Sequence, residues 1–247
     1  MSRLLLGLLG IFVLFQWSAS ALGSDRGQAG LVVAALVVAA TLAVERMWFA
    51  ATLRTAALAI GLGRPNARGL VVAAAISLLL FLVVILFVRV TGAAASVERG
   101  ALPMIPGLFA QGGVAEETLF RGYLFGHLRR GRSFWHAAWL SMLPFIAVHV
   151  LLFFTMPFFV ALAALLLSVV LSFPLAHLFE LGGDTIWAPA LLHFVVQGTV
   201  KILIVSGDAA ATFPFVWMLA SAVVPMLAFA VRRPGDLTHA GATGQAL

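Results

Sequence analysis

The chain has 247 residues, of which 63% are hydrophobic and only 10% are charged, and its mean hydropathy is +1.11. Soluble domains carry about 25% charged residues, so this composition excludes an ordinary soluble protein and indicates a polytopic membrane protein. The absence of cysteine excludes disulfides, thiolate catalysis and cysteine-bound metals. The net charge of +6 fits cytoplasmic loops facing anionic lipid better than nucleic acid, so we expect membrane lipid and no nucleic acid as partners.

Eight apolar runs follow one another along the chain, and a span needs roughly 20 such residues. They lie at residues 3–22, 29–45, 69–92, 102–126, 134–154, 157–178, 185–205 and 211–231. The sequence therefore predicts an all-α transmembrane helix bundle of about eight spans, forming a single membrane domain over residues 1–247. The first run also resembles a signal peptide, so its cleavage stays open. We expect residues 234–247 to form a disordered tail.

The positions of the arginines predict an orientation. They gather before the first run, in the second and fourth connections, and after the last run: Arg3; Arg46, Arg54, Arg64 and Arg68; Arg129, Arg130 and Arg132; Arg232 and Arg233. In an eight-span arrangement all four clusters fall on one side, and basic residues mark cytoplasmic loops. We therefore predict that both termini are cytoplasmic. Arginine makes up nearly all of the basic residues, which together with the excess of Ala and Gly points to a prokaryotic plasma membrane.

The fourth run contains three charged residues in the segment QGGVAEETLFRG, namely Glu116, Glu117 and Arg121. An ionisable side chain within a span costs about 2.5–3.5 kcal/mol, so such groups usually face a cavity and serve a function. Glu117 precedes Arg121 by four residues, which predicts a buried structural ion pair. Glu116 points about 100° away around the helix, which predicts an unpaired carboxylate that can accept a proton from water. A single structural network of all three residues is the alternative.

Two later runs each place a histidine within a span. His149 closes the segment FIAVH, and His193 precedes Gln197 by four residues in HFVVQ, so these last two share a helix face. Each histidine alone is more simply explained as a hydrogen-bonded core residue. Together with Glu116, however, the two imidazoles can activate water, directly or through a metal. Lys201 lies one turn after Gln197. It either contacts a carboxylate of the substrate, or it pairs within the protein or extends its charged end to the membrane–water interface.

These three segments together resemble the CAAX-processing and bacteriocin-processing (CPBP) family of intramembrane proteases. EETLFRG matches the family's EExxxR motif, FIAVH matches FxxxH, and WAPALLHFVVQ is similar to the third motif, HxxxN or HxxxD. The motifs follow the family order within residues 102–206, which we expect to form the catalytic core. The resemblance implies an all-helical endopeptidase with a water-accessible intramembrane cavity, acting on a membrane-associated peptide or protein. It also implies that Glu117 and Arg121 form a structural pair.

The resemblance further implies that Glu116 and His149 polarise the attacking water, while His193 and Gln197 stabilise the oxyanion. Gln197 departs from the family pattern, because it stands where Asn or Asp is expected and is one methylene longer. A shift of about 1 Å at such a donor can lower the rate about a hundredfold. A catalytically inactive family member that acts as a membrane scaffold is therefore one alternative function.

Metal dependence stays open, although the family is often classed with the metalloproteases. If a divalent metal such as zinc is bound, the expected ligands are Glu116, His149 and His193. The HExxH zinc signature is absent. Glutamine is also an uncommon metal ligand, which favours a metal-independent role for the third motif.

Other membrane functions fit the sequence less well. An aspartyl intramembrane protease needs two intramembrane aspartates, whereas Asp184 and Asp208 fall at the ends of runs. A rhomboid-type serine protease is disfavoured because no GxSxG-like element is present. A proton-coupled transporter remains the rival from another class, because proton relays use the same intramembrane residue types.

Overall fold

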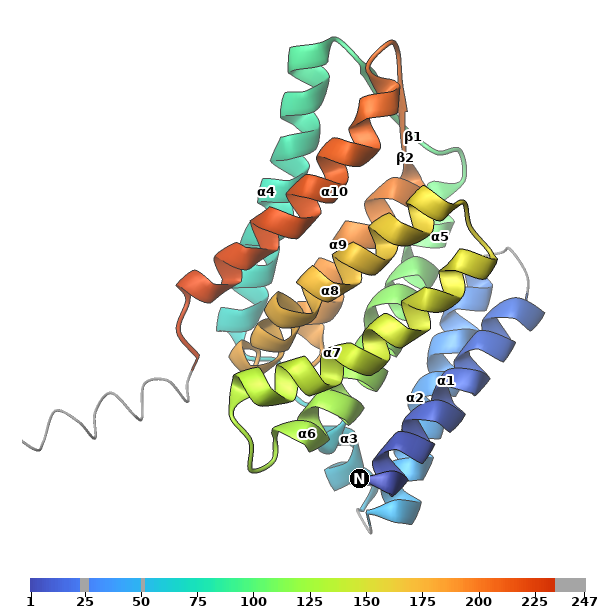
Figure 1. Ribbon diagram of the computed structural model, residues 1–247, viewed down its shortest axis with the longest axis vertical. Helices are drawn as coiled ribbons and strands as arrows, with labels where there is room; N and C mark the ends of the chain where they lie inside the picture. The colour runs from blue at the N-terminus through green and yellow to red at the C-terminus, as the bar shows by residue number, and fades with distance from the viewer. Residues whose placement is uncertain (23–26, 50–51, 234–247) are drawn as a thin grey trace, which may run out of the picture.

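The structure is a computed structural model, and it describes residues 1–22, 27–49 and 52–233. The tail expected at 234–247 lies outside these residues. The chain forms a bundle that is helical almost throughout (Figure 1). In the part described, six helices are long and apolar enough to cross a membrane. The all-α polytopic bundle predicted from the sequence is confirmed.

The six long helices account for most of the bundle. They are α1 (Ser2–Ala21), α2 (Gln28–Trp48), α4 (Ala67–Thr91), α7 (Phe134–Val150) with its extension η3 (Leu151–Phe154), α8 (Phe158–Leu181), and the run of η4 (Ala210–Thr212), α10 (Phe213–Val223) and η5 (Val224–Ala230). A short helix, α3 (Leu53–Ala59), lies in the connection between α2 and α4.

The two remaining predicted spans are helical but do not meet the same criterion of length and composition. Residues 101–129 are divided among α5 (Ala101–Leu108), the π-helical segments η1 (Phe109–Ala115) and η2 (Thr118–Phe125), and α6 (Gly126–Arg129). The helix α9 (Trp187–Ile202) has only 16 residues. The number of eight spans therefore stays a prediction, and the two irregular spans are the ones that carry the charged motif and His193.

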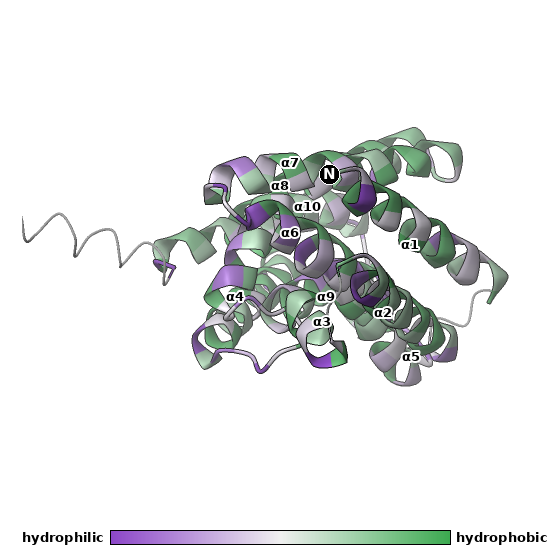
Figure 2. Ribbon diagram, turned by 90° about the horizontal axis from the view of Figure 1, so that it is seen from below, coloured by the Kyte–Doolittle hydropathy of each residue, from purple (hydrophilic) through white to green (hydrophobic). Residues whose placement is uncertain are grey.

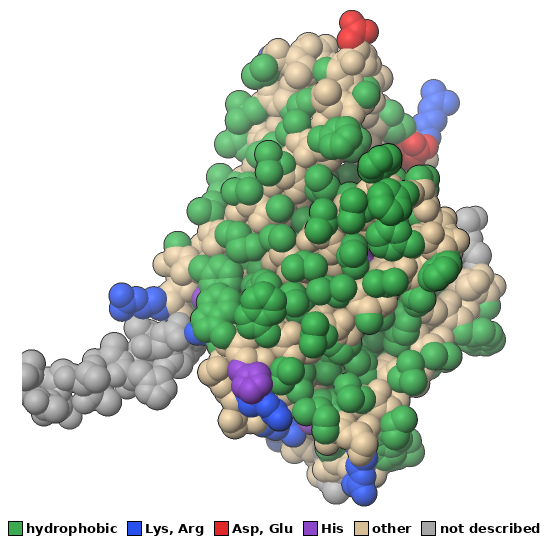
Figure 3. Space-filling model, in the orientation of Figure 1, with side chains coloured by type: hydrophobic (Ala, Val, Ile, Leu, Met, Phe, Trp, Pro, Cys, Tyr) green, Lys and Arg blue, Asp and Glu red, His purple; other side chains and the backbone are tan. Residues whose placement is uncertain are grey.

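Large apolar side chains cover the outside of the long helices (Figure 3). On α4, for example, Leu78 is 68% exposed and Val90 is 83% exposed. Hydrophilic residues gather in loops and at helix ends, as the view along the bundle shows (Figure 2). Lipid solvates such an apolar surface, whereas water does not, so the exposed side chains agree with an integral membrane protein.

Glycines allow the inner helices to pack closely. A Cβ at Gly30 of α2 would overlap the backbone of Gly107 in α5, and a Cβ at Gly122 of η2 would overlap the carbonyl of Ile60. Small residues at such crossings bring helix backbones together within membranes, where van der Waals packing drives association. The segment from α5 to α6 is held in the centre of the bundle in this way.

A short antiparallel strand pair joins two connections at one end of the bundle. Strand β1 (Ala94–Val97) pairs with β2 (Leu203–Ser206), and Ala94 lies opposite Ser206. Sequence patterns did not predict these strands, because each has four residues and every residue of β1 is exposed. The pair ties the chain just before α5 to the chain just after α9.

Candidate active site

The two adjacent glutamates stand between the π-helical segments η1 and η2. Such segments have wider turns than an α-helix and are frequent at functional sites. η1 packs against α2 and α9. A Cβ at Gly113 would meet the carbonyl of Ala190 in α9, so glycine permits this close approach. Glu116 and Glu117 are thereby brought beside the helix that carries the third motif.

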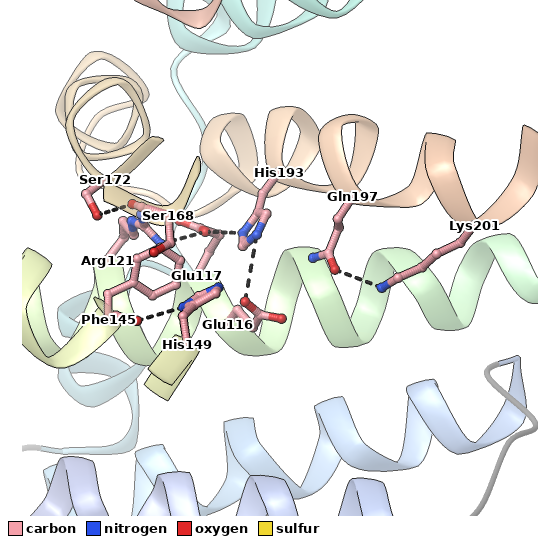
Figure 4. A network of polar contacts seen from close by, with 10 residues as sticks. All are labelled: Glu116, Glu117, Arg121, Phe145, His149, Ser168, Ser172, His193, Gln197 and Lys201. Carbon is pink, nitrogen blue, oxygen red and sulfur yellow. Dashed lines mark hydrogen bonds and ion pairs between the residues drawn. The ribbon is translucent and has the colours of Figure 1, made fainter. Parts of the chain in front are cut away.

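Glu117 is the centre of a buried polar group. Its Oε1 accepts a hydrogen bond from Arg121 Nη1 at 2.9 Å and another from His193 Nδ1 at 2.6 Å (Figure 4). All three side chains are buried. Glu117 therefore pairs with Arg121 as the spacing predicts, and it also orients His193. The second contact was not predicted, because 76 positions separate the two residues.

Glu116 lies on the open side of this group. Its Oε2 is 3.7 Å from Nε2 of His193, which is too long for a hydrogen bond. The Glu116 side chain is 20% exposed, whereas that of Glu117 is fully buried. The two neighbouring carboxylates thus occupy different environments. One is held by two donors, and the other is directed to where water can reach it.

Phe145 connects the FxxxH motif to the buried group. The guanidinium carbon of Arg121 lies 4.4 Å from the centre of the Phe145 ring, within range for a cation–π contact. The same ring makes edge contacts with the imidazoles of His149 and His193. In addition, the carbonyl of Phe145 accepts a hydrogen bond from His149 Nδ1 at 2.7 Å. This contact leaves Nε2 of His149 on the side that faces Glu116 (Figure 4).

Gln197 is held by its neighbours in α9 and η1. Lys201 Nζ donates to Gln197 Oε1 at 2.9 Å, which turns the amide nitrogen away from the lysine (Figure 4). Nε2 of Gln197 is buried and has no hydrogen-bond partner among the described residues. A Cβ at Gly112 would overlap this amide. The longer side chain of glutamine therefore fits here because position 112 is glycine.

A cavity of about 330 Å³ reaches this group. Glu116 and Gln197 contribute to its wall, and Gln111, Gly112 and Lys201 continue the wall from the same two helices. Its other side is apolar and is formed by residues of α1, α2 and α5 and by Met156 after η3. His149 and His193 stand behind Glu116 and do not line the cavity themselves.

Comparison with protein families agrees with this arrangement. Residues 98–199 match the family described as Type II CAAX prenyl endopeptidase Rce1-like. This segment of the chain is therefore similar to an Rce1-like domain. The match includes all seven residues at the defined positions of the three motifs, and the Rce1-like family is a family of membrane endopeptidases within the CPBP group. Neither the curated proteins nor the solved structures provide a match.

The residues of the Rce1-like domain do not form a metal site in this arrangement. Within residues 1–22, 27–49 and 52–233, no group of three His, Cys, Asp or Glu side chains is placed to hold a metal ion. The set of Glu116, His149 and His193 therefore does not fit a metal as placed, and no step below depends on one.

Two contributors to the site were not selected from the sequence. Gln111 and Gly112 both line the cavity, immediately before the charged motif. The signal for them was available, because adjacent glycines inside an apolar helix indicate close approach of another group. Lys201 was selected correctly as a neighbour of Gln197 by its spacing, and the structure shows it donating to that side chain.

Proposed function

We propose that this protein is an intramembrane endopeptidase that hydrolyses a peptide bond in a membrane-associated peptide or protein. One observation supports the proposal most strongly. Glu116, His149 and His193 come from three separate helices and lie close together beside one cavity, which Glu116 lines (Figure 4). A carboxylate with two imidazoles in a site of low dielectric constant is a constellation suited to water activation.

The proposed reaction begins with a water molecule between Glu116 and His149. Glu116 accepts a proton as the water oxygen attacks the carbonyl carbon of the substrate, and Nε2 of His149 accepts the hydrogen bond from the other proton of the water. The proton then passes from Glu116 to the leaving amine as the carbon–nitrogen bond breaks. Glu117 and Arg121 hold the helix that carries the base.

The negative charge on the tetrahedral intermediate needs donors on the opposite wall. We assign this role to Nε2 of Gln197, a buried donor that has no partner in the described part of the chain. His193 contributes from Nε2 when its ring is doubly protonated, because Nδ1 is engaged with Glu117. Fixed donors of this kind are usually worth about 10²–10³ in kcat. Lys201 fixes the orientation of the Gln197 amide by donating to its Oε1.

The proposed setting is a prokaryotic plasma membrane with both ends of the chain on the cytoplasmic side. The arginine clusters support this orientation. Trimming of peptides, bacteriocins or membrane proteins is the processing that we expect there, rather than that of prenylated CAAX ends.

A comparison of protein termini tests the function directly. Membranes from cells that express wild type or Glu116→Ala at equal levels are compared, with Glu98→Ala as a control, because Glu98 is exposed and lies outside the site. New termini with wild type and Glu98→Ala, but not with Glu116→Ala, would identify the substrates. Equal termini in all three, with each chain stably inserted, would reject proteolysis and favour the scaffold or the proton-coupled transporter.

A further inference from the structure

Two cavities in the described part of the bundle lie at opposite ends. The one that Glu116 lines is bordered by Ala19 near the end of α1, Ala29 at the start of α2, Met156 after η3 and Lys201 in the last turn of α9. The other, of about 400 Å³, is bordered by the first residues of α1 and by α6, and none of its lining residues belongs to the three motifs. Of these two, it is the first cavity that leads to the proposed base.

The basic residues distinguish these two ends. Ten of the 14 arginines lie at the start of α1, between the end of α2 and the start of α4, around α6, and after η5. This is the lower end in Figure 3, where blue side chains gather. Arg89 and Arg99 lie at the opposite end, which also carries Glu98 and Asp208. Short loops rich in arginine stay in the cytoplasm during membrane insertion.

The cavity that reaches Glu116 thus opens at the end that is poor in arginine. We infer that water and the substrate reach the site from the extracytoplasmic side of the membrane. This inference rests on the proposed function and narrows its substrate class to segments exposed outside the cytoplasm, such as exported peptides or the outer portions of membrane proteins. The wall of Ala19, Ala29 and Gly112 suits an extended chain, because small side chains leave room for a backbone.

The natural lack of cysteine permits a direct test by labelling. Three single-cysteine variants are prepared: Met156→Cys at the cavity mouth, Asp208→Cys at the same end, and Arg64→Cys at the arginine-rich end. All three side chains are exposed. A maleimide that cannot cross membranes is added to cells with an intact plasma membrane, and again after lysis. We expect Met156→Cys and Asp208→Cys to react in intact cells, and Arg64→Cys to react only after lysis.

Each other pattern would overturn the inference. Reaction of Arg64→Cys in intact cells, with Met156→Cys protected until lysis, would place the cavity mouth in the cytoplasm. Failure of Met156→Cys to react even after lysis, while Asp208→Cys reacts, would show that the mouth is closed to water. Labelling does not depend on catalysis. If the labelling is as expected but Glu116→Ala leaves the protein termini unchanged, the proposed function fails while the side of access stands.

Discussion

At the scale of single residues, the two adjacent glutamates occupy different environments. Glu117 is enclosed and holds both Arg121 and His193, whereas Glu116 lines the cavity. Exchanging the two roles would require rotating the helix, because neighbouring residues point in different directions. Substitutions at these adjacent positions should therefore have different effects, one on stability and the other on turnover.

Loss of the Glu117 charge should destabilise the fold. Glu117→Gln keeps the size of the side chain but leaves the charge of Arg121 buried without its partner, and breaking a buried pair in this way costs about 3–5 kcal/mol. The measurement is thermal unfolding of the purified protein in detergent. Glu98→Gln, at an exposed position, should unfold like wild type. Equal unfolding temperatures for Glu117→Gln and wild type would contradict a stabilising role for the ion pair.

Chelation should leave proteolysis unchanged, since no three His, Cys, Asp or Glu side chains in the described part of the chain are placed to hold a metal ion. We expect purified protein treated with a chelator and then dialysed to cleave a substrate found by the terminus comparison at the wild-type rate. Loss of cleavage that added zinc restores would show that the three side chains rearrange around a metal.

At the scale of secondary structure elements, the π-helical segment η1 and the helix α9 form one unit of the site. Gly112 in η1 leaves space for the Gln197 amide, and Gly113 lets the two backbones approach. This contact explains how a glutamine fits at position 197, since its amide group occupies space that a side chain at position 112 would otherwise fill. The donor thus keeps a fixed place at the cavity wall.

A methyl group at position 112 should displace this donor. Gly112→Ala is expected to lower kcat by about tenfold to a hundredfold, because a shift of about 1 Å is enough to misplace a catalytic group. Adding Gln197→Asn to Gly112→Ala should recover part of the rate, since the shorter amide avoids the methyl group. Gly10→Ala is the matched control, because nothing lies within 4 Å of a Cβ there. Identical rates for Gly112→Ala and Gly10→Ala would refute the contact.

At the scale of the whole molecule, α1 is part of the bundle and of the cavity wall. Leu4 and Leu8 are buried on its inner face, Ala19 lines the cavity, and the carbonyl of Leu4 accepts a hydrogen bond from the Tyr123 hydroxyl at 3.3 Å. The segment that resembles a signal peptide in sequence is therefore also a helix that packs into the bundle. The packing means that the site depends on α1.

Shortening a side chain should affect stability on the buried face of α1 but not on its exposed face. Leu8 is 7% exposed and its neighbour Leu9 is 59% exposed. Leu8→Ala should lower the stability by about 2–5 kcal/mol through the cavity that it leaves, whereas Leu9→Ala removes only contact with lipid. Unfolding in detergent, followed by intrinsic fluorescence, gives both values. Equal stability of the two variants would show that α1 does not dock as described.

The sequence predicted those features of the site that depend on local spacing. The pairing of Glu117 with Arg121 and the proximity of Gln197 and Lys201 each follow from a separation of four residues on a helix. Contacts between distant segments, such as that of Glu117 with His193, depend on how helices cross, and no periodicity encodes this. The π-helical geometry could not be predicted either, because the sequence pattern of η1 does not differ from that of an α-helix.

The close fit of Gly112 against Gln197 has an evolutionary consequence. If a bulkier residue at position 112 and a glutamine at position 197 exclude each other, the two positions cannot drift independently among descendants of this chain. Lineages that keep glutamine should retain glycine, and those that substitute asparagine should tolerate a side chain in its place. Position 112 in η1 and position 197 in α9 should then covary among related sequences.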